Sequence, residues 1–214
     1  MQKFFRSLWC SFILLVLAVG CTKDSDDVIK ELSYRKEHLK SYHAQGELSL
    51  YTGKHPLVYM VEVKYKPPCF CRVLLKNKTE DITQILLRNK ERSYLIAPQL
   101  GKCFAFEKDW SAKPGQLYLY QEIIASVIND HNANIIHNKD GGYKVTIQPN
   151  FYNPHKEGYM VIYFNKDLYP KLIEVFEKQG YDQLLLSRMK FNNFKNDVQC
   201  HENDFKLCEE KSNG

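Results

Sequence analysis

Two histidines and two aspartates lie close together in the second half of the chain, and their types could support acid–base catalysis. His131 and His137 flank the start of a polar stretch, with Asp130 and Asp140 beside them. A histidine paired with a carboxylate can act as a general base. Histidines are also common on exposed turns, and the sequence has no Gly-x-Ser-x-Gly motif to supply a nucleophile. The pattern favours a solvated turn over a catalytic site.

A second acidic pair, Glu107 and Asp109, follows a predicted strand. Paired carboxylates catalyse glycoside hydrolysis, but two acids after a strand are more often a solvated turn. The sequence also lacks a His-Glu-x-x-His helix, a phosphate-binding loop and a dinucleotide fingerprint. We therefore predict no catalytic residues and a non-enzymatic protein, with a hydrolase as the least favoured alternative.

The cysteines downstream of residue 21 leave several interpretations open; they are Cys69, Cys71, Cys103, Cys200 and Cys208. Cys69 and Cys71 share one face of a strand, so they cannot easily bridge each other. The Cys-Phe-Cys spacing also lacks the second ligand pair of a zinc site. We predict no metal and no cofactor, and small buried side chains are the favoured interpretation. A Cys200–Cys208 disulfide is an alternative.

The N-terminus carries the strongest functional signal. Lys3 and Arg6 precede an apolar run over residues 8–19. A bilayer span needs about 20 apolar residues, so this run predicts a signal peptide rather than a stable span. It ends in Leu-Ala-Val-Gly-Cys, which resembles the lipobox of bacterial lipoproteins, and Cys21 would receive the diacylglyceryl group. An ordinary signal peptide with an incidental cysteine is the alternative.

The chain therefore divides into four predicted segments. They are a lipoprotein signal peptide at 1–20, a lipidated tether at 21–27, a folded domain at 28–208 and a flexible tail at 209–214. Two acyl chains hold a protein stably on a membrane, so we expect an extracytoplasmic, lipid-anchored protein of the cell membrane. The net charge of +5 falls by two when Lys3 and Arg6 are removed. A value this mild does not indicate nucleic-acid binding.

The folded region has the alternating pattern of antiparallel strands, dry on one face and wet on the other. Between Pro56 and Phe106 five strands are predicted, at 57–66, 69–76, 82–88, 92–97 and 102–107. Further strands are predicted at 43–51, from 135, and at 143–148, 159–164, 170–178 and 182–194, with a short closing strand at Phe205. A sheet of about ten or eleven strands must curl or close.

Two helices accompany the strands. The first spans Ser25 to Tyr42, with an apolar stripe of Val28, Leu32, Leu39 and Tyr42. The second follows Pro114-Gly115, and its stripe comprises Leu117, Tyr120, Ile124 and Val127. The second helix is too apolar to lie on the surface, so we expect it to pack on the dry face of the sheet. The predicted fold is α+β, an incomplete antiparallel β-barrel with helices on its concave face.

The order of these elements resembles a known family. A lipidated cysteine and a short helix precede VEVKYKPPCFCRVLL and ILLRNKERSYLIAPQLGKCFAFEKDW, then an apolar helix and a terminal meander. Residues 25–207 are similar to the LolA/LolB-type lipoprotein-sorting fold, which RseB-like sensors share. More narrowly they resemble Gram-positive sporulation lipoproteins of the YdcC and GerS type. The resemblance implies a half-barrel lidded by helices, with an apolar cavity that holds acyl chains.

The resemblance also implies candidate residues for a cavity or partner site. The family's basic residue before a proline, at the cavity mouth, matches Lys66 and Pro67. The aromatic and proline positions of the following hairpin match Tyr94 and Pro98. A lysine cannot reproduce the planar fork of an arginine. The apolar helix adds further candidates, which are Tyr120, Ile124 and Val127.

The implied function is a membrane-anchored binding or regulatory protein of sporulation or spore germination. In that branch a GerS-like lipoprotein supports a cell-wall amidase. The predicted partners are the membrane, an envelope protein such as an amidase, and an acyl chain in the cavity. A lipid or lipoprotein acyl-chain receptor or carrier is the second hypothesis, and an envelope hydrolase is the third.

Overall fold

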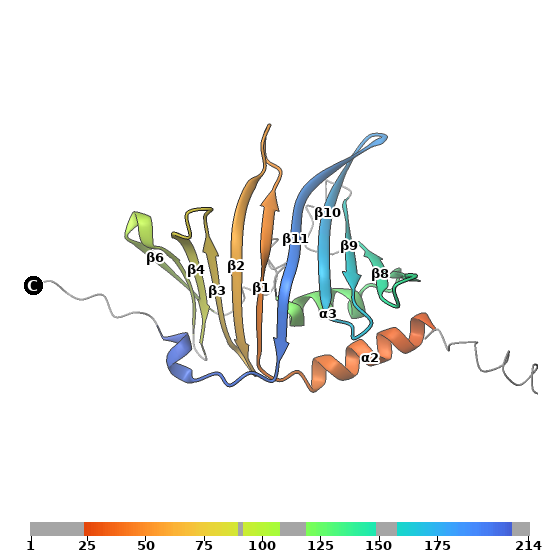
Figure 1. Ribbon diagram of the computed structural model, residues 1–214, viewed down its shortest axis with the longest axis horizontal. Helices are drawn as coiled ribbons and strands as arrows, with labels where there is room; N and C mark the ends of the chain where they lie inside the picture. The colour runs from red at the N-terminus through yellow and green to blue at the C-terminus, as the bar shows by residue number, and fades with distance from the viewer. Residues whose placement is uncertain (1–23, 90–91, 108–118, 149–157, 207–214) are drawn as a thin grey trace, which may run out of the picture.

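The computed structural model describes residues 24–89, 92–107, 119–148 and 158–206. Within these residues the chain forms one eleven-stranded antiparallel sheet and two α-helices (Figure 1). The strand order is β6-β5-β4-β3-β2-β1-β11-β10-β9-β8-β7, so β1 and β11 meet at the centre. The sheet is curved and open, because β6 and β7 lie at its opposite ends (Figure 1).

The strands of the first half are β1 (Tyr42–Leu50), β2 (Leu57–Lys66), β3 (Phe70–Lys76), β4 (Ile82–Arg88), β5 (Arg92–Ala97) and β6 (Lys102–Glu107). Those of the second half are β7 (Asn134–His137), β8 (Tyr143–Ile147), β9 (Gly158–Phe164), β10 (Pro170–Gln179) and β11 (Asp182–Asn196). The helices are α2 (Ser25–Glu37) and α3 (Tyr120–Asn129), and two short 3-10 helices are η1 (Pro98–Leu100) and η2 (Glu202–Phe205).

Alternation along the strands gives the sheet one dry, concave face. Val61, Val63 and Tyr65 of β2 are buried, whereas Glu62 and Lys64 between them are partly exposed. The buried residues of both helices belong to the same core as these side chains. The predicted open antiparallel half-barrel with helices on its concave face is confirmed.

Helix α2 is shorter than predicted. The Asp24 carboxylate accepts a hydrogen bond from the Ser25 backbone N–H at 2.7 Å, which caps the N-terminus. The helix ends at Glu37, whereas the sequence predicted Tyr42. That prediction is wrong because Tyr42 pairs with Tyr65 of β2 and with Asn196 of β11, so it opens strand β1 instead.

The predicted closing strand at Phe205 is also wrong. Residues 202–205 form the 3-10 helix η2, and Phe205 is buried against Phe70 and Leu87. These two residues alternate with core residues of β3 and β4, so the cluster lies on the convex face. The Lys64 ammonium also lies 3.1 Å from the Asp204 carboxylate. The C-terminal segment therefore covers the back of β2 to β4.

The predicted signal peptide and the lipidation candidate Cys21 lie outside the described residues, and residues 25–27 of the predicted tether form the first turn of α2. Within the described ranges, neither helix has the length and apolar character needed to cross a membrane. The second helix was predicted correctly over its described part, while Leu117 of its predicted stripe lies outside the described residues.

Candidate functional site

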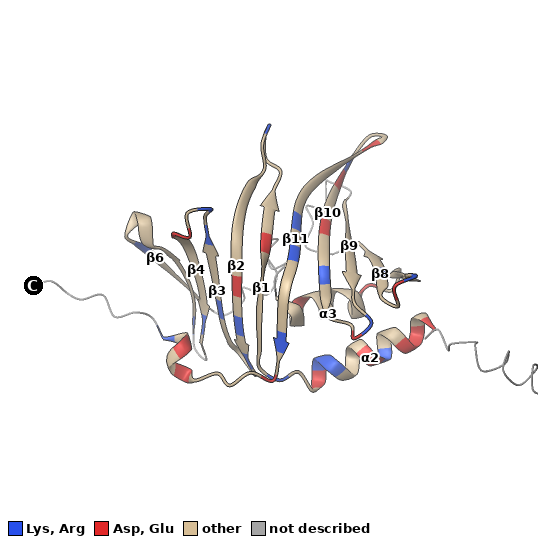
Figure 2. Ribbon diagram, viewed as in Figure 1, with Lys and Arg blue, Asp and Glu red and all other residues tan. Residues whose placement is uncertain are grey.

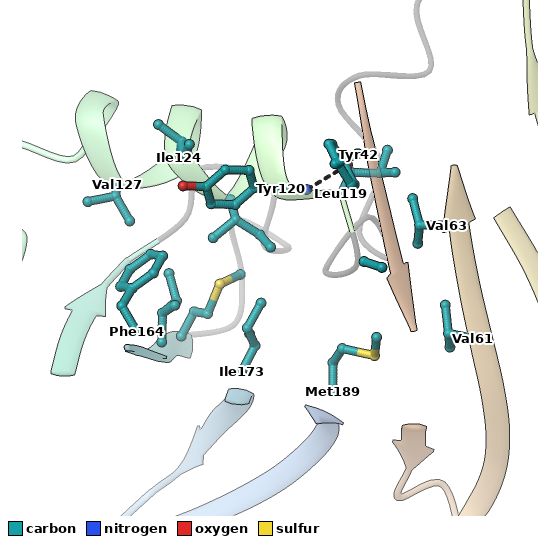
Figure 3. Packing of buried hydrophobic residues seen from close by; sticks show 14 of the residues in the cluster. Tyr42, Val61, Val63, Leu119, Tyr120, Ile124, Val127, Phe164, Ile173 and Met189 are labelled. Atoms are coloured by element: carbon teal, nitrogen blue, oxygen red, sulfur yellow. Dashed lines mark hydrogen bonds between the residues drawn. The ribbon is translucent and has the colours of Figure 1, made fainter. Parts of the chain in front are cut away.

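Helix α3 fills part of the concave face. Tyr120, Ile124 and Val127 are all buried, and Figure 3 shows them near Phe164 and Ile173. Burying one such apolar side chain contributes roughly 1.5–3 kcal/mol. The structure thus brings together the three predicted candidates on this helix, and it packs them into the core.

The Tyr42 hydroxyl fixes the start of α3. It accepts a hydrogen bond from the Tyr120 backbone N–H at 3.0 Å (Figure 3). It also donates one to Gln121 Oε1 at 2.7 Å. The residue at the N-cap position, Leu119, has no side-chain oxygen to cap the helix. A strand residue far away in the sequence therefore satisfies one of the free N–H groups of the first turn.

A row of stacked aromatic rings connects the sheet to α2. Ring centroids are 5.1 Å apart for Tyr65 and Tyr42, 5.1 Å for Tyr42 and Phe194, and 4.7 Å for Phe194 and Tyr169. The Arg35 guanidinium of α2 lies 5.4 Å from the centroid of the Tyr169 ring, which is a cation–π distance. The row holds α2 against the lower end of the concave face.

Burial changes the ionisation of groups near this row. It raises the pKa of Tyr65 to about 12 and the pKa of Cys71 to about 12. Burial also raises the pKa of Glu122 on α3, and the charges of Arg88 and Lys36 offset part of that rise. Neutral forms of the tyrosine and thiol are therefore favoured inside the barrel.

The remaining predicted site residues lie elsewhere. Tyr94 pairs with Leu87 and packs with Phe205, so it lies on the convex face, opposite α3. Lys66 pairs with Phe70 on that same face. Pro67 follows β2 directly, and Pro98 is exposed in η1. The candidate set therefore divides between the two faces of the sheet, and the structure does not gather it into one site.

The concave face becomes progressively exposed towards β6. One cross-strand row runs from Val73 through Leu86 and Leu95 to Phe104, as the strand register shows. Val73 and Leu86 are buried and Leu95 is partly buried, whereas Phe104 is 49% exposed. We call Leu86, Leu95 and Phe104, with Arg88 beside them, the open wall. No sequence pattern indicated it, because its exposure depends on where the helices lie.

Strand β6 ends the sheet beside this wall. Within the described residues its outer edge pairs with no other strand. Leu100, in the turn before β6, is 70% exposed. Strand β7 forms the opposite edge, where Ile136 is 49% exposed. Exposed apolar side chains beside the outermost strand of a sheet are typical of a site where another chain docks.

Among the described residues, charges of both signs are mixed. Figure 2 shows acidic and basic residues interspersed along α2 and on the central strands. On the convex face the Glu62 carboxylate lies 3.2 Å from His43 Nε2 and 3.6 Å from Lys76 Nζ, and Arg188 pairs with Glu174 at 2.7 Å. Such mixed pairs indicate a solvated face.

Three of the residues considered for catalysis, Asp130, Asp140 and His137, have structural contacts. The Asp130 carboxylate accepts hydrogen bonds from the backbone N–H groups of Asn132 and Gln148. A hydrogen bond from the Gly142 N–H and the nearby Lys171 ammonium lower the pKa of Asp140. The His137 ring contacts Tyr143 edge-on at 5.2 Å. In the part of the chain that is described, no three His, Cys, Asp or Glu side chains are placed to hold a metal ion.

The cysteines are divided between the core and the surface. Cys71 is buried, Cys69 and Cys200 are partly buried, and Cys103 is exposed, all as free thiols. The Cys200 thiol lies 3.8 Å from the Tyr65 carbonyl oxygen. Cys208, its predicted alternative partner, lies outside the described residues.

Solved structures of other proteins share this fold. An uncharacterized conserved protein from Thermus thermophilus aligns with a TM-score of 0.56 at 11% identity, covering 88% of this chain and 96% of that one. The MucA/MucB complex of Pseudomonas aeruginosa aligns with a TM-score of 0.50 at 13% identity, covering 85% of this chain and 61% of that one. At these identities the similarity concerns the fold alone.

Two further solved structures align with lower TM-scores. A LolA superfamily protein from Nitrosomonas europaea aligns with a TM-score of 0.45 at 10% identity, over 87% of this chain and 99% of that one. The structure of the CwlD amidase from Clostridioides difficile in complex with the GerS lipoprotein also aligns. Its TM-score is 0.40 at 15% identity, over 82% of this chain and 98% of the matched chain.

Sequence comparison gives the family. The chain is 29% identical over 201 residues to the sporulation protein YdcC of Bacillus subtilis (strain 168). This match covers 94% of the chain and 57% of the relative's length, so the chain corresponds to little more than half of that protein. A family model described as "Sporulation protein YdcC-like" matches residues 1–205. The chain therefore belongs to the YdcC-like family of sporulation proteins.

Proposed function

We propose that this protein is a membrane-anchored, extracytoplasmic binding protein of sporulation that acts by docking an envelope protein, without catalysing a reaction. The lipid on Cys21 would hold it at the membrane, and the open wall with the β6 edge would receive the partner. Membership of the YdcC-like family supports the link to sporulation. The MucA/MucB structure, which shares this fold, is a complex between proteins, and that is the kind of partnership proposed here.

The exposure of Phe104 is the observation that carries this proposal. A phenylalanine that is half exposed at the end of a buried apolar row leaves carbon surface in water. Covering that surface with a partner is favourable by roughly 25 cal/mol per Å² of apolar area.

The experiment is affinity purification of the full-length protein from sporulating cells, with Phe104→Asp compared against Ile136→Asp. Both side chains are 49% exposed and both lie on edge strands, so each variant adds one charge at an equally exposed position. We expect Phe104→Asp to lose the co-purifying envelope protein and Ile136→Asp to retain it. Equal retention of the same protein by both variants would reject docking at the open wall.

A second candidate function is an acyl-chain receptor or carrier. The row from Val73 to Phe104 favours it, because the row presents aliphatic and aromatic carbon that grows more exposed towards β6. Native mass spectrometry after mild extraction distinguishes the two functions. A carrier should retain a non-covalent acyl species, whereas a protein-docking module should show only its own mass with the covalent lipid.

A further inference from the structure

A pocket of about 400 Å³ lies at the far end of the sheet from the open wall. Its polar and aromatic lining comes from the α3–β7 connection and from β7 to β10; it comprises Asn132, Asn134, Thr146, Gln148, Tyr159 and Lys178, and Ile147 completes it. The volume falls in the usual range for small-molecule sites, which is roughly 300–1,000 Å³.

The pocket opens on the convex side of the sheet. Val145, Ile147 and Met160 are core residues, and Thr146 and Tyr159 alternate with them along β8 and β9. Asn134 pairs with Thr146 across β7 and β8, so it shares their face. The pocket is therefore separated from the concave face by the sheet itself.

Two sets of contacts hold the lining in place. The Asp130 carboxylate accepts hydrogen bonds from the Asn132 N–H at 2.8 Å and the Gln148 N–H at 2.6 Å, so it fastens two lining segments together. The Tyr159 ring stacks on Phe176 with centroids 4.9 Å apart, and its hydroxyl donates a hydrogen bond to Gln183. A site whose walls are fixed in this way loses less entropy when a ligand binds.

The chemistry of the lining restricts the ligand. Three side-chain amides and one threonine hydroxyl offer both donors and acceptors, and no hydrogen bond joins any of these four side chains to another described group. Tyr159 adds an aromatic ring and Lys178 adds one cationic side chain, and no lining residue is an acid. A sugar has the matching features, because its hydroxyl groups both donate and accept while its ring presents an apolar C–H face.

We propose that this pocket binds a saccharide, with amide and hydroxyl groups of the lining contacting its hydroxyl or acetamido substituents. Asn134, Thr146 and Gln148 form the polar part of the site, and Tyr159 provides a surface for the sugar ring. This site does not depend on the open wall. A protein could dock at one face while the other face binds glycan.

The test is isothermal titration calorimetry of the detergent-purified full-length protein with a trimer of N-acetylglucosamine. Asn134→Ala and Gln148→Ala remove polar groups from the pocket, and Asn192→Ala is the matched control, since Asn192 is an exposed strand asparagine that does not line it. We expect each pocket variant to bind about tenfold more weakly, as the loss of one or two hydrogen bonds implies. The control should bind like the wild-type protein.

Thermal unfolding of each variant accompanies the titration, so that weaker binding is attributed to the pocket only when the unfolding midpoint is unchanged. Absence of heat with the wild-type protein, or equal affinity for the wild type and both pocket variants, would overturn the proposal. The titration needs no protein partner, so its result is independent of docking at Phe104.

Discussion

At the scale of single residues, Tyr42 has more influence than its place at a strand end suggests. Its hydroxyl bonds to both Tyr120 and Gln121, and its ring stacks on Tyr65 and Phe194. One side chain thus positions α3 and joins the two central strands to β2. The sequence pattern assigned Tyr42 to the apolar stripe of the first helix, because its spacing from Leu39 fits a helix. The same spacing also fits a boundary between a helix and a strand.

Replacing Tyr42 by Phe removes the hydroxyl and keeps the ring. The Tyr120 N–H and the Gln121 amide lose their partner in a buried place, so we expect the free energy of unfolding to fall by about 1–3 kcal/mol. Urea denaturation measures this change. Tyr181→Phe is the control, because Tyr181 is fully exposed, and it should stay within about 0.5 kcal/mol of the wild type. Equal stability of both variants would contradict the capping role.

The buried thiol of Cys71 makes stability depend on alkaline pH. Its pKa rises from 9.0 to about 12 in the folded protein, so the folded state keeps a proton that the unfolded state releases. This contribution is fully present below pH 9 and is lost as the pH rises from 9 to 12. Above pH 9 the free energy of unfolding should decrease by up to about 1.4 kcal/mol per pH unit from this group.

Cys71→Ala tests that dependence. The variant starts from a lower stability because it loses packing, but its decline between pH 9 and pH 10 should be shallower than that of the wild type. Tyr65 adds its own loss only above pH 10, since its pKa rises from 10.0 to about 12. Urea denaturation at pH 7.5, 9 and 10 supplies the slopes. Parallel slopes would show that the thiol is not the titrating group.

At the scale of elements, alternation in the sequence predicted the strands well. The bounds of β4, β5 and β6 agree with the predicted ranges, because one polar and one apolar face impose a period of two. The convex cluster around Phe205 could not be predicted, since a lone aromatic residue in a polar tail has no period. Tyr94 was matched to a family position, but its face depends on strand register, which only the fold supplies.

The joint between β1 and β11 depends on a glycine. The register shifts between Gln45 and Gly46, and a Cβ on Gly46 would lie 2.3 Å from the Lys190 carbonyl oxygen and 2.8 Å from Met189 Cε. We expect Gly46→Ala to destabilise the protein by roughly 1–3 kcal/mol, because backbone must move.

Gly53→Ala is the matched control for that substitution. A Cβ there meets no atom within 4 Å, so its stability should equal or slightly exceed that of the wild type. Chemical denaturation of both variants gives the comparison. If Gly46→Ala left the free energy of unfolding unchanged, the two halves of the sheet would pack more loosely at this joint than the structure indicates.

At the scale of the whole molecule, the sheet carries two separate candidate binding surfaces, and the sequence predicts a lipid anchor in addition. The open wall lies near β6, and the pocket that contains Asn134 and Thr146 lies at the opposite end of the sheet, near β7. The sequence predicted the curved sheet and the buried helix from residue patterns. It could not predict how the helices distribute over the sheet, and therefore which half of the concave face remains exposed.

The anchor has its own test. Cys21→Ala removes the thiol that would carry the diacylglyceryl group, so we expect the protein to move from the membrane to the soluble fraction, since the remaining residues provide no acyl chains. Fractionation and immunoblotting measure the distribution. Cys103→Ala, which alters an exposed cysteine on β6, should leave the protein on the membrane. Membrane retention of Cys21→Ala would reject lipid anchoring.

Docking at the open wall is the central claim, and cross-linking in sporulating cells tests it most directly. A photo-reactive amino acid is placed at position 104 or, as the control, at position 136, which has the same exposed fraction of 49% on the opposite edge strand. We predict one discrete protein adduct from position 104 and none of that mass from position 136. No adduct from position 104, or the same adduct from both positions, would contradict the account.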